Sequence, residues 1–338
     1  MSNYELTQVL RVGFNPHHPD LLPNAFEKHT RAGNMILQHS DPTQFTSRIG
    51  TTVLLSHISD LVSSEYRDIR VVTVLIPCQI MFACGDRKEY FVTSSEDWSR
   101  VLKDIASKSP IYADTIYPLA FQVPAVMQRL DEILAQRAQA CQYRLLLDLL
   151  TEIEQLQGAI GDWLLACEAK IRDPDDKAVS SPAWQVDCVP SRLFPHFDVP
   201  EIFAPTVDFA THDLAIATSL YWTFILQLSI MAEDIQSTLL SRWPSHAARS
   251  ELCPAPAQIA NLICQSFGYW MRACGTINAC QLCFSFPHRI AWRWYARQGE
   301  EFKTEAASCA KRSELLRKSS LHGFVVEYIT DSYYALPP

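Results

Sequence analysis

Cysteine is the residue type with the clearest chemical potential in this chain, which has 11 of them among 338 residues. Two stand at the spacing of a zinc or redox pair, in Cys280-Gln281-Leu282-Cys283. A closed zinc site needs two further ligands, and the sequence has neither a second such pair nor two histidines at helical spacing. A redox pair belongs at a helix start after a strand, and no strand is evident. We therefore expect buried, reduced thiols, no metal and no cofactor.

Acidic chemistry has one candidate, the segment Asp173-Pro174-Asp175-Asp176. It contains the Asp-x-Asp-Asp pattern of class II terpene cyclases, in which a carboxylic acid of raised pKa protonates an olefin. Here the segment lies between Arg172 and Lys177, next to a proline, which favours a solvated loop. The usual glycine-rich, nucleophile-elbow and metalloprotease motifs are missing. We assign no catalytic residue, and a cyclase-like enzyme of a natural-product pathway is the alternative function.

Aromatic side chains are concentrated in the C-terminal half. Tyr221 and Trp222 fall on one expected helix, and Phe267 and Trp270 on another. Such residues could wall an apolar pocket for a hydrophobic small molecule. The other interpretation is plain core packing, for which large aromatic side chains are equally suited.

We expect helices to position all of these residues. The chain has only 10 glycines and 20 prolines. A glycine-poor chain has few positive-φ turns, which argues against a nucleotide-binding sheet or a barrel. We predict an all-α fold, a single large helical domain over residues 25–338 after an irregular segment 1–24, with a surface loop at about 172–205. The expected helices are 25–39, 45–66, 68–83, 98–106, 115–130, 135–171, 213–240, 257–274, 276–283, 288–297 and 301–318.

The segment from Leu214 to Ala232 has no formal charge over 19 residues and approaches the length of a membrane span. Acidic residues, Asp213 and Glu233-Asp234, flank it, whereas a span normally has basic residues on its cytoplasmic side. We predict a fully buried central helix and no membrane span. The N-terminus has no signal-peptide pattern, so secretion is not expected.

The net charge of −8 bears on partners. Nucleic-acid binding draws much of its affinity from cationic contacts to phosphate. A strongly basic segment is missing, so we expect no direct DNA binding by this chain.

The order of several motifs resembles the fungal-specific transcription factor domain, the helical regulatory region of fungal zinc-cluster regulators. The segment ICQSFGYWM and the later FSFPHRIAWRWYARQG are similar to its two terminal signatures, and TSLYWTFILQLSIM to its Tyr-Trp helix. Earlier segments resemble its first tryptophan helix and its linker helix. The residues that carry the resemblance are Trp98, Pro124, Asp131, Trp163, Tyr221, Trp222, Ser266, Tyr269, Phe286 and Pro287.

This resemblance implies an all-helical, nuclear regulatory domain, often controlling secondary metabolism; one branch, the yeast sterol-sensing regulators, binds a lipid in this domain. The chain departs from the pattern because no six-cysteine cluster or basic linker precedes the domain in these 338 residues. We therefore expect an accessory transcriptional regulator of a fungal secondary-metabolite pathway. It would act through a protein partner or as a homodimer and could sense an apolar small molecule. The expected location is the nucleus, with the cytoplasm as the alternative.

Overall fold

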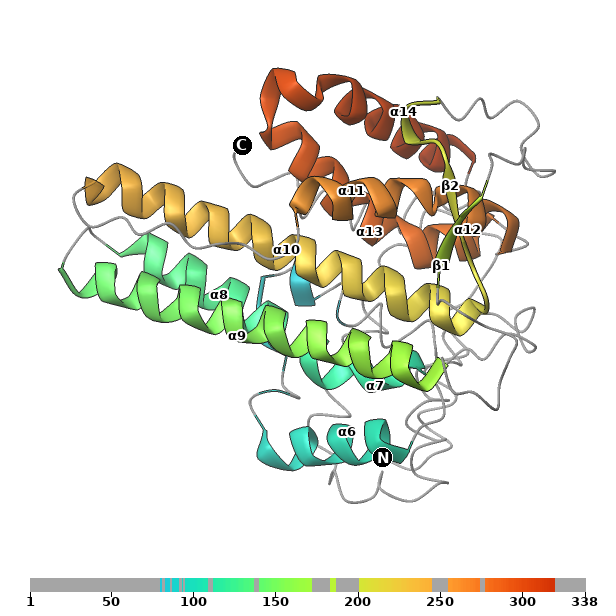
Figure 1. Ribbon diagram of the computed structural model, residues 1–338. Helices are drawn as coiled ribbons and strands as arrows, with labels where there is room; N and C mark the ends of the chain where they lie inside the picture. The colour runs from blue at the N-terminus through green and yellow to red at the C-terminus, as the bar shows by residue number, and fades with distance from the viewer. Residues whose placement is uncertain are drawn as a thin grey trace, which may run out of the picture.

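Helices make up almost all of the chain that the computed structural model describes, namely residues 80, 83–85, 87–90, 93, 95–108, 112–136, 140–171, 183–186, 201–244, 255–273 and 277–319 (Figure 1). The prediction of an all-α fold is confirmed. The elements are α6 (Glu96–Lys108), α7 (Tyr112–Ala120), α8 (Gln122–Ala135), α9 (Ala140–Ile171), β1 (Ala183–Val186), η4 (Glu201–Phe203), β2 (Thr206–Phe209), α10 (His212–Arg242), α11 (Pro256–Gln265), α12 (Phe267–Ala273), α13 (Ile277–Arg297), η6 (Gly299–Phe302) and α14 (Lys303–Ser319).

The central element is α10. It begins after Thr211, whose Oγ1 accepts a hydrogen bond from the Leu214 amide at 3.2 Å, and Asp213 lies in its first turn. Every residue from Leu214 to Ala232 is buried. In the described part of the chain, α10 alone is long and apolar enough to cross a membrane, and its most apolar window lies wholly inside the protein. This burial supports the interpretation as a core helix.

Two groups of helices enclose α10. One face of α10 packs against α7, α8 and α9, which precede it in sequence; we call this the N-terminal side. Another face packs against α11 and α13, which follow it, with α14 beyond them; we call this the C-terminal side (Figure 1). One continuous cluster of buried apolar side chains runs through both groups. A helix buried on both sides needs no polar stripe, which explains why α10 has no charged residue between Leu214 and Ala232.

On the N-terminal side, the helix predicted over 115–130 is two helices in the structure, with a break at Phe121. The break places Pro124 in the first turn of α8, where the missing amide hydrogen costs nothing. The helix predicted over 98–106 is confirmed as α6, and the Ser95 hydroxyl accepts a hydrogen bond from the Trp98 amide at 3.4 Å. The long helix predicted over 135–171 is α9, which starts at Ala140.

On the C-terminal side, two helix boundaries were predicted wrongly. The helix expected over 257–274 is broken at Ser266, whose hydroxyl donates to the Ile263 carbonyl at 2.8 Å and so competes with the helical pattern. The reverse holds at Pro287: the helices expected over 276–283 and 288–297 form one continuous helix, α13. Phe284 and Phe286 beside the proline are completely buried, and their packing offsets the ~3 kcal/mol that an interior proline costs.

The segment predicted as a surface loop over 172–205 contains a strand. β1 pairs antiparallel with β2, with Ala183 opposite Phe209 and Val186 opposite Thr206. Phe203 of η4 is only 1% exposed, so this segment also packs onto the core. The expectation that no strand is present is therefore corrected by this short ribbon. The irregular segment 1–24, the helices predicted over 25–39 and 45–66 and most of 68–83 lie outside the described residues.

Candidate functional site

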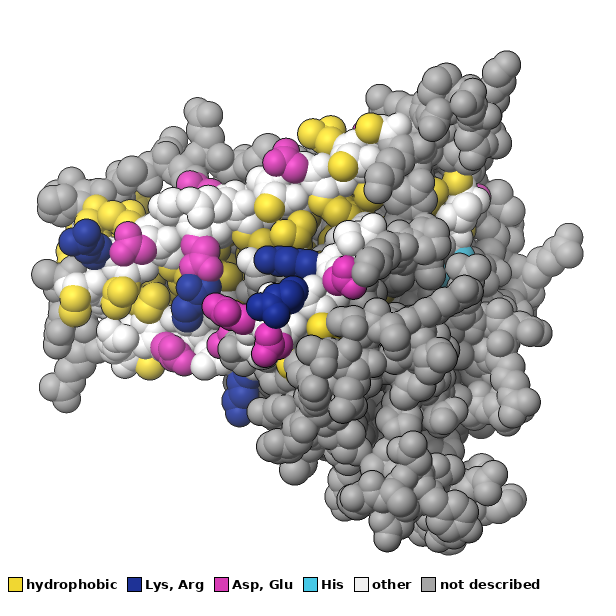
Figure 2. Space-filling view, turned by 90° about the horizontal axis from the view of Figure 1, so that it is seen from below, with side chains coloured by type: hydrophobic (Ala, Val, Ile, Leu, Met, Phe, Trp, Pro, Cys, Tyr) yellow, Lys and Arg dark blue, Asp and Glu magenta, His cyan; other side chains and the backbone are white. Residues whose placement is uncertain are grey.

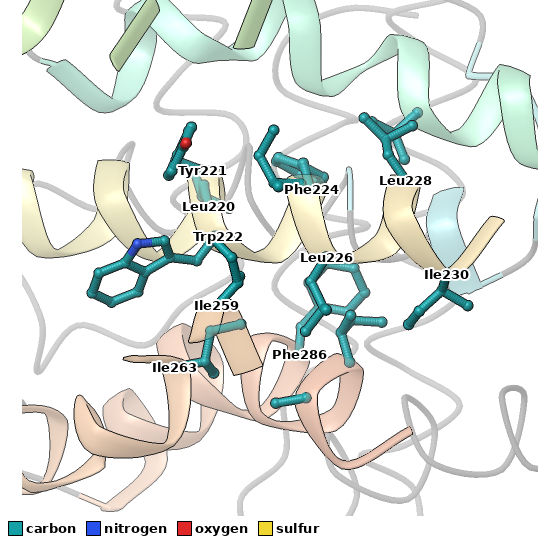
Figure 3. Close-up of a cluster of buried hydrophobic side chains, with 14 of the residues drawn as sticks. Leu220, Tyr221, Trp222, Phe224, Leu226, Leu228, Ile230, Ile259, Ile263 and Phe286 are labelled. Atoms are coloured by element: carbon teal, nitrogen blue, oxygen red, sulfur yellow. The ribbon is translucent and has the colours of Figure 1, made fainter. Parts of the chain in front are cut away.

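The four residues predicted to line an apolar pocket lie on both sides of α10. Tyr221 points toward the N-terminal helices, together with Phe224 and Leu228, and its ring centroid is 6.4 Å from that of Trp163 on α9 (Figure 3). Trp222 points away from that side (Figure 3). Because α10 itself separates them, Tyr221 and Trp222 cannot face one common cavity.

Trp222 and Trp270 belong to a continuous row of rings. Phe209 of β2 lies 5.8 Å from Trp222 and 4.9 Å from Tyr269, and Tyr269 is 5.4 Å from Trp270, all between ring centroids. His212, at the start of α10, contacts the Trp270 ring edge-on at 5.4 Å. The β1–β2 ribbon therefore supplies the ring that joins the two tryptophans.

Phe267 faces a different group. Its ring lies 5.2 Å from Phe284 and 6.4 Å from His288, both on α13. The guanidinium of Arg312 on α14 sits 4.8 Å from the Phe267 ring and 4.6 Å from the Phe203 ring. The four predicted residues thus occupy three places, each surrounded by packed side chains. The apolar pocket stays a prediction, and Trp222 and Trp270 are the two of the four residues that share one group of rings.

Sequence reasoning missed the cluster of metal-ligating side chains that the structure assembles. Cys264 from α11, His288 from α13 and Cys309 from α14 are all buried, and one ligand atom from each lies within 4.8 Å of the other two. The two sulfur atoms are 3.5 Å apart. In the sequence the cysteines stand 45 residues apart, so no local spacing could reveal the pair. The only hint was that His288 and Cys264 stand among apolar neighbours.

The electrostatics of this cluster favour neutral side chains. Burial, reinforced by the positive charges of Arg312 and Arg289, lowers the pKa of His288 to about 3, so its imidazole is neutral at physiological pH. The hydrogen bond with Cys264 and burial raise the pKa of the Cys309 thiol. A raised pKa favours the protonated thiol of Cys309 over the reactive thiolate in the protein alone.

Arg312 holds the cluster in place. It is 2% exposed, and its Nη1 donates a hydrogen bond to the Cys264 carbonyl oxygen at 2.9 Å. The contacts of its guanidinium with the Phe203 and Phe267 rings are cation–π interactions. This side chain therefore links α14 to η4, α11 and α12. Although Arg312 follows Lys311 in a polar helix, it is therefore part of the core.

The remaining candidate residues have simpler positions. Asp234 at the end of the apolar stretch of α10 pairs with Arg297, as expected for the polar end of a buried segment. The side chains of Cys280 and Cys283 and the Asp173–Asp176 segment lie outside the described residues, so the redox and cyclase hypotheses stay untested.

Comparisons of this chain with protein-family models, with curated proteins and with solved structures give no match. Any functional assignment therefore depends on the residues of the chain itself and on their arrangement.

Proposed function

We propose that this chain is an accessory transcriptional regulator of a fungal secondary-metabolite pathway, working in the nucleus through a protein partner or as a homodimer. The proposal includes an apolar small molecule as a ligand of the helical domain. It rests on the order of the sequence motifs that resemble the fungal-specific transcription factor domain.

The observation that best supports this proposal is the packing of the three motifs that carry most of the resemblance. The Tyr-Trp motif lies in the middle of α10, the ICQSFGYWM motif spans α11 and α12, and the Phe-Pro motif lies inside α13. Ile259 and Ile263 of α11 and Phe286 of α13 lie against one side of α10 (Figure 3). Because the three motifs pack against one another, a change in one affects the packing of the other two. This contact gives a structural reason for the three motifs to occur together in one chain.

The surface charge is consistent with a protein partner in preference to DNA. Figure 2 shows basic and acidic side chains interspersed on the face seen from below. Among the described residues, Arg87 is paired with Asp131 at 2.5 Å and Arg129 with Glu152, so these basic groups are already partly neutralised. DNA binding needs basic groups gathered in one field. We expect the purified chain to show no specific DNA binding by itself.

Deletion of the gene tests the regulatory role. A coherent set of transcripts should rise or fall, and reintroduction of the wild-type gene should restore them. If transcripts stay unchanged while a metabolic intermediate accumulates, the regulator proposal is wrong and the enzyme alternative takes its place.

A ligand screen tests the small-molecule part of the proposal. A hydrophobic ligand at a hundredfold excess over its dissociation constant should stabilise the fold by ~2.7 kcal/mol and quench tryptophan fluorescence. A folded Trp222→Phe variant should lose this shift, whereas Tyr221→Phe, on the other side of α10, should keep it. If a broad apolar library shifts nothing, the domain is a filled scaffold that works through protein partners alone.

A further inference from the structure

The buried cluster of Cys264, His288 and Cys309 has the composition of a metal-ligand set. Two sulfur ligands and one imidazole are typical of zinc sites, and the three residues come from three helices, of which α11 and α14 both pack against α13. We propose that these three side chains bind one thiophilic metal ion, Zn²⁺, which joins α11, α13 and α14. This assignment departs from the expectation of no metal drawn from the sequence.

The distances fit such a site. Two thiolates on one tetrahedral zinc ion, each with a bond of about 2.3 Å, stand about 3.8 Å apart, and a sulfur and a nitrogen ligand about 3.6 Å apart. The observed separation of the two sulfur atoms is 3.5 Å, and the histidine ligand atom lies within 4.8 Å of both. Shifts of about an ångström in side chains therefore close the coordination shell without moving the helices.

The histidine is prepared as a ligand. Its Nδ1 lies 3.4 Å from the Ser313 hydroxyl, and its Nε2 is buried with no hydrogen-bond partner among the described residues. Buried polar atoms without a partner are uncommon and call for an explanation. A zinc ion bound by Nε2 supplies that explanation, and Ser313 then takes the position of the group that orients a metal-bound imidazole.

Binding balances in atoms and charge. The ion replaces the thiol protons of Cys264 and Cys309, so two zinc–sulfur bonds form, two S–H bonds break and two protons pass to solvent. Two thiolates and a neutral imidazole cancel the charge of the ion, and a water molecule completes the fourth position. A disulfide between the two cysteines would leave the third member, His288, without a role, which is why the metal is the better interpretation.

Metal analysis of the full chain, purified with zinc present and then dialysed, tests the proposal. We expect about one zinc ion per chain. Substitution by Co²⁺ should give a thiolate-to-cobalt charge-transfer band and the visible bands of a tetrahedral ion. Cys264→Ala and Cys309→Ala should each weaken Co²⁺ binding by at least tenfold, whereas Cys167→Ala, a buried cysteine on α9, should leave it unchanged.

Three results would overturn the proposal. A wild-type chain that holds no zinc and gives no cobalt charge-transfer band contradicts it, whether or not the variants fold. Retention of the metal by folded Cys264→Ala and Cys309→Ala chains assigns the metal to other ligands. Conversion of the two thiols to a disulfide under mild oxidation, with zinc unable to protect them, makes the pair a redox couple and not a metal site.

Discussion

The two sides of α10 bury different kinds of side chain. On the N-terminal side, α7, α8 and α9 meet α10 mainly through apolar side chains, together with a buried hydrogen bond between Gln157 and Ser229. Charged pairs such as Arg129–Glu152 lie near the surface there. On the C-terminal side, the core contains three basic side chains, His288, Arg289 and Arg312, and they are the only buried basic residues in the described part of the chain. Burial of such groups is costly unless they have a partner or a use. We infer that the N-terminal side supports the fold and that the C-terminal side carries the specific chemistry.

Truncation of one large ring on each side gives the strongest test of this contrast. Trp270→Ala on the C-terminal side and Phe224→Ala on the N-terminal side remove completely buried side chains, and each should cost ~3–5 kcal/mol of unfolding free energy. Denaturant unfolding measures both. A far smaller cost for Trp270→Ala in a folded protein would indicate that its surroundings are a cavity and not a filled core.

Polar contacts inside the N-terminal side are the next test. Gln157 of α9 donates a hydrogen bond from Nε2 to the Ser229 hydroxyl of α10 at 3.1 Å, and both residues are buried. Ser229→Ala leaves this amide donor unpaired and should cost ~1–3 kcal/mol. The double change Gln157→Leu with Ser229→Ala should recover most of the loss. If the double variant is as unstable as the single one, the hydrogen bond is not the cause.

A smaller effect concerns pH at the joint between α10 and α13. Burial raises the pKa of Glu233 above its ordinary value of 4.5, although the nearby Trp294 indole and the charge of Arg297 oppose the shift. Between the unfolded and the folded pKa, the folded state therefore binds more protons than the unfolded state, so stability should fall as pH rises through this window. Thermal unfolding across mildly acidic pH measures the slope. Glu233→Gln should flatten it, whereas the exposed Glu301→Gln should not.

The smallest effect should come from the surface pair on the N-terminal side. Arg129 and Glu152 are 45% and 39% exposed, so water and salt screen their attraction. A double-mutant cycle with Arg129→Ala and Glu152→Ala should give an interaction energy of about 0–1 kcal/mol that vanishes in high salt. A larger, salt-resistant value would show that charge pairing contributes substantially to the N-terminal side.

The sequence predicted the elements whose signals are local. The uncharged stretch from Leu214 to Ala232 marks the core of α10 within its own residues, and the helices expected over 98–106 and 135–171 correspond to α6 and α9. Boundaries that depend on tertiary packing were missed. The continuity of α13 through Pro287 depends on the burial of Phe284 and Phe286 against other elements, which one segment of sequence does not describe. The break at Ser266 is local, but a serine inside a helical pattern does not by itself show whether its hydroxyl bonds back to the chain.

The same reason limits the prediction of the site. Tyr221 and Trp222 are adjacent in sequence but point to different sides of one helix, Tyr221 toward Trp163 and Trp222 toward Phe209, so their proximity along the chain was misleading. Cys264 and Cys309 are distant in sequence but nearly in contact. Only the packing of α11 and α14 on α13 brings these sulfur atoms together. Sequence alone could identify aromatic residues as important, but it could not show which of them lie next to one another in the structure.

The burial of α10 on both sides has a consequence for how the domain comes apart. Neither group of helices can cover its own apolar surface without α10, so opening one group exposes a face of the same helix that holds the other. Local opening of either half is therefore coupled to the whole, and the two halves belong to one cooperative unit and not to two independent foldons. A fragment that ends before His212 or begins after Arg242 lacks α10. Such a fragment would retain the helices of one side but not the helix against which they pack.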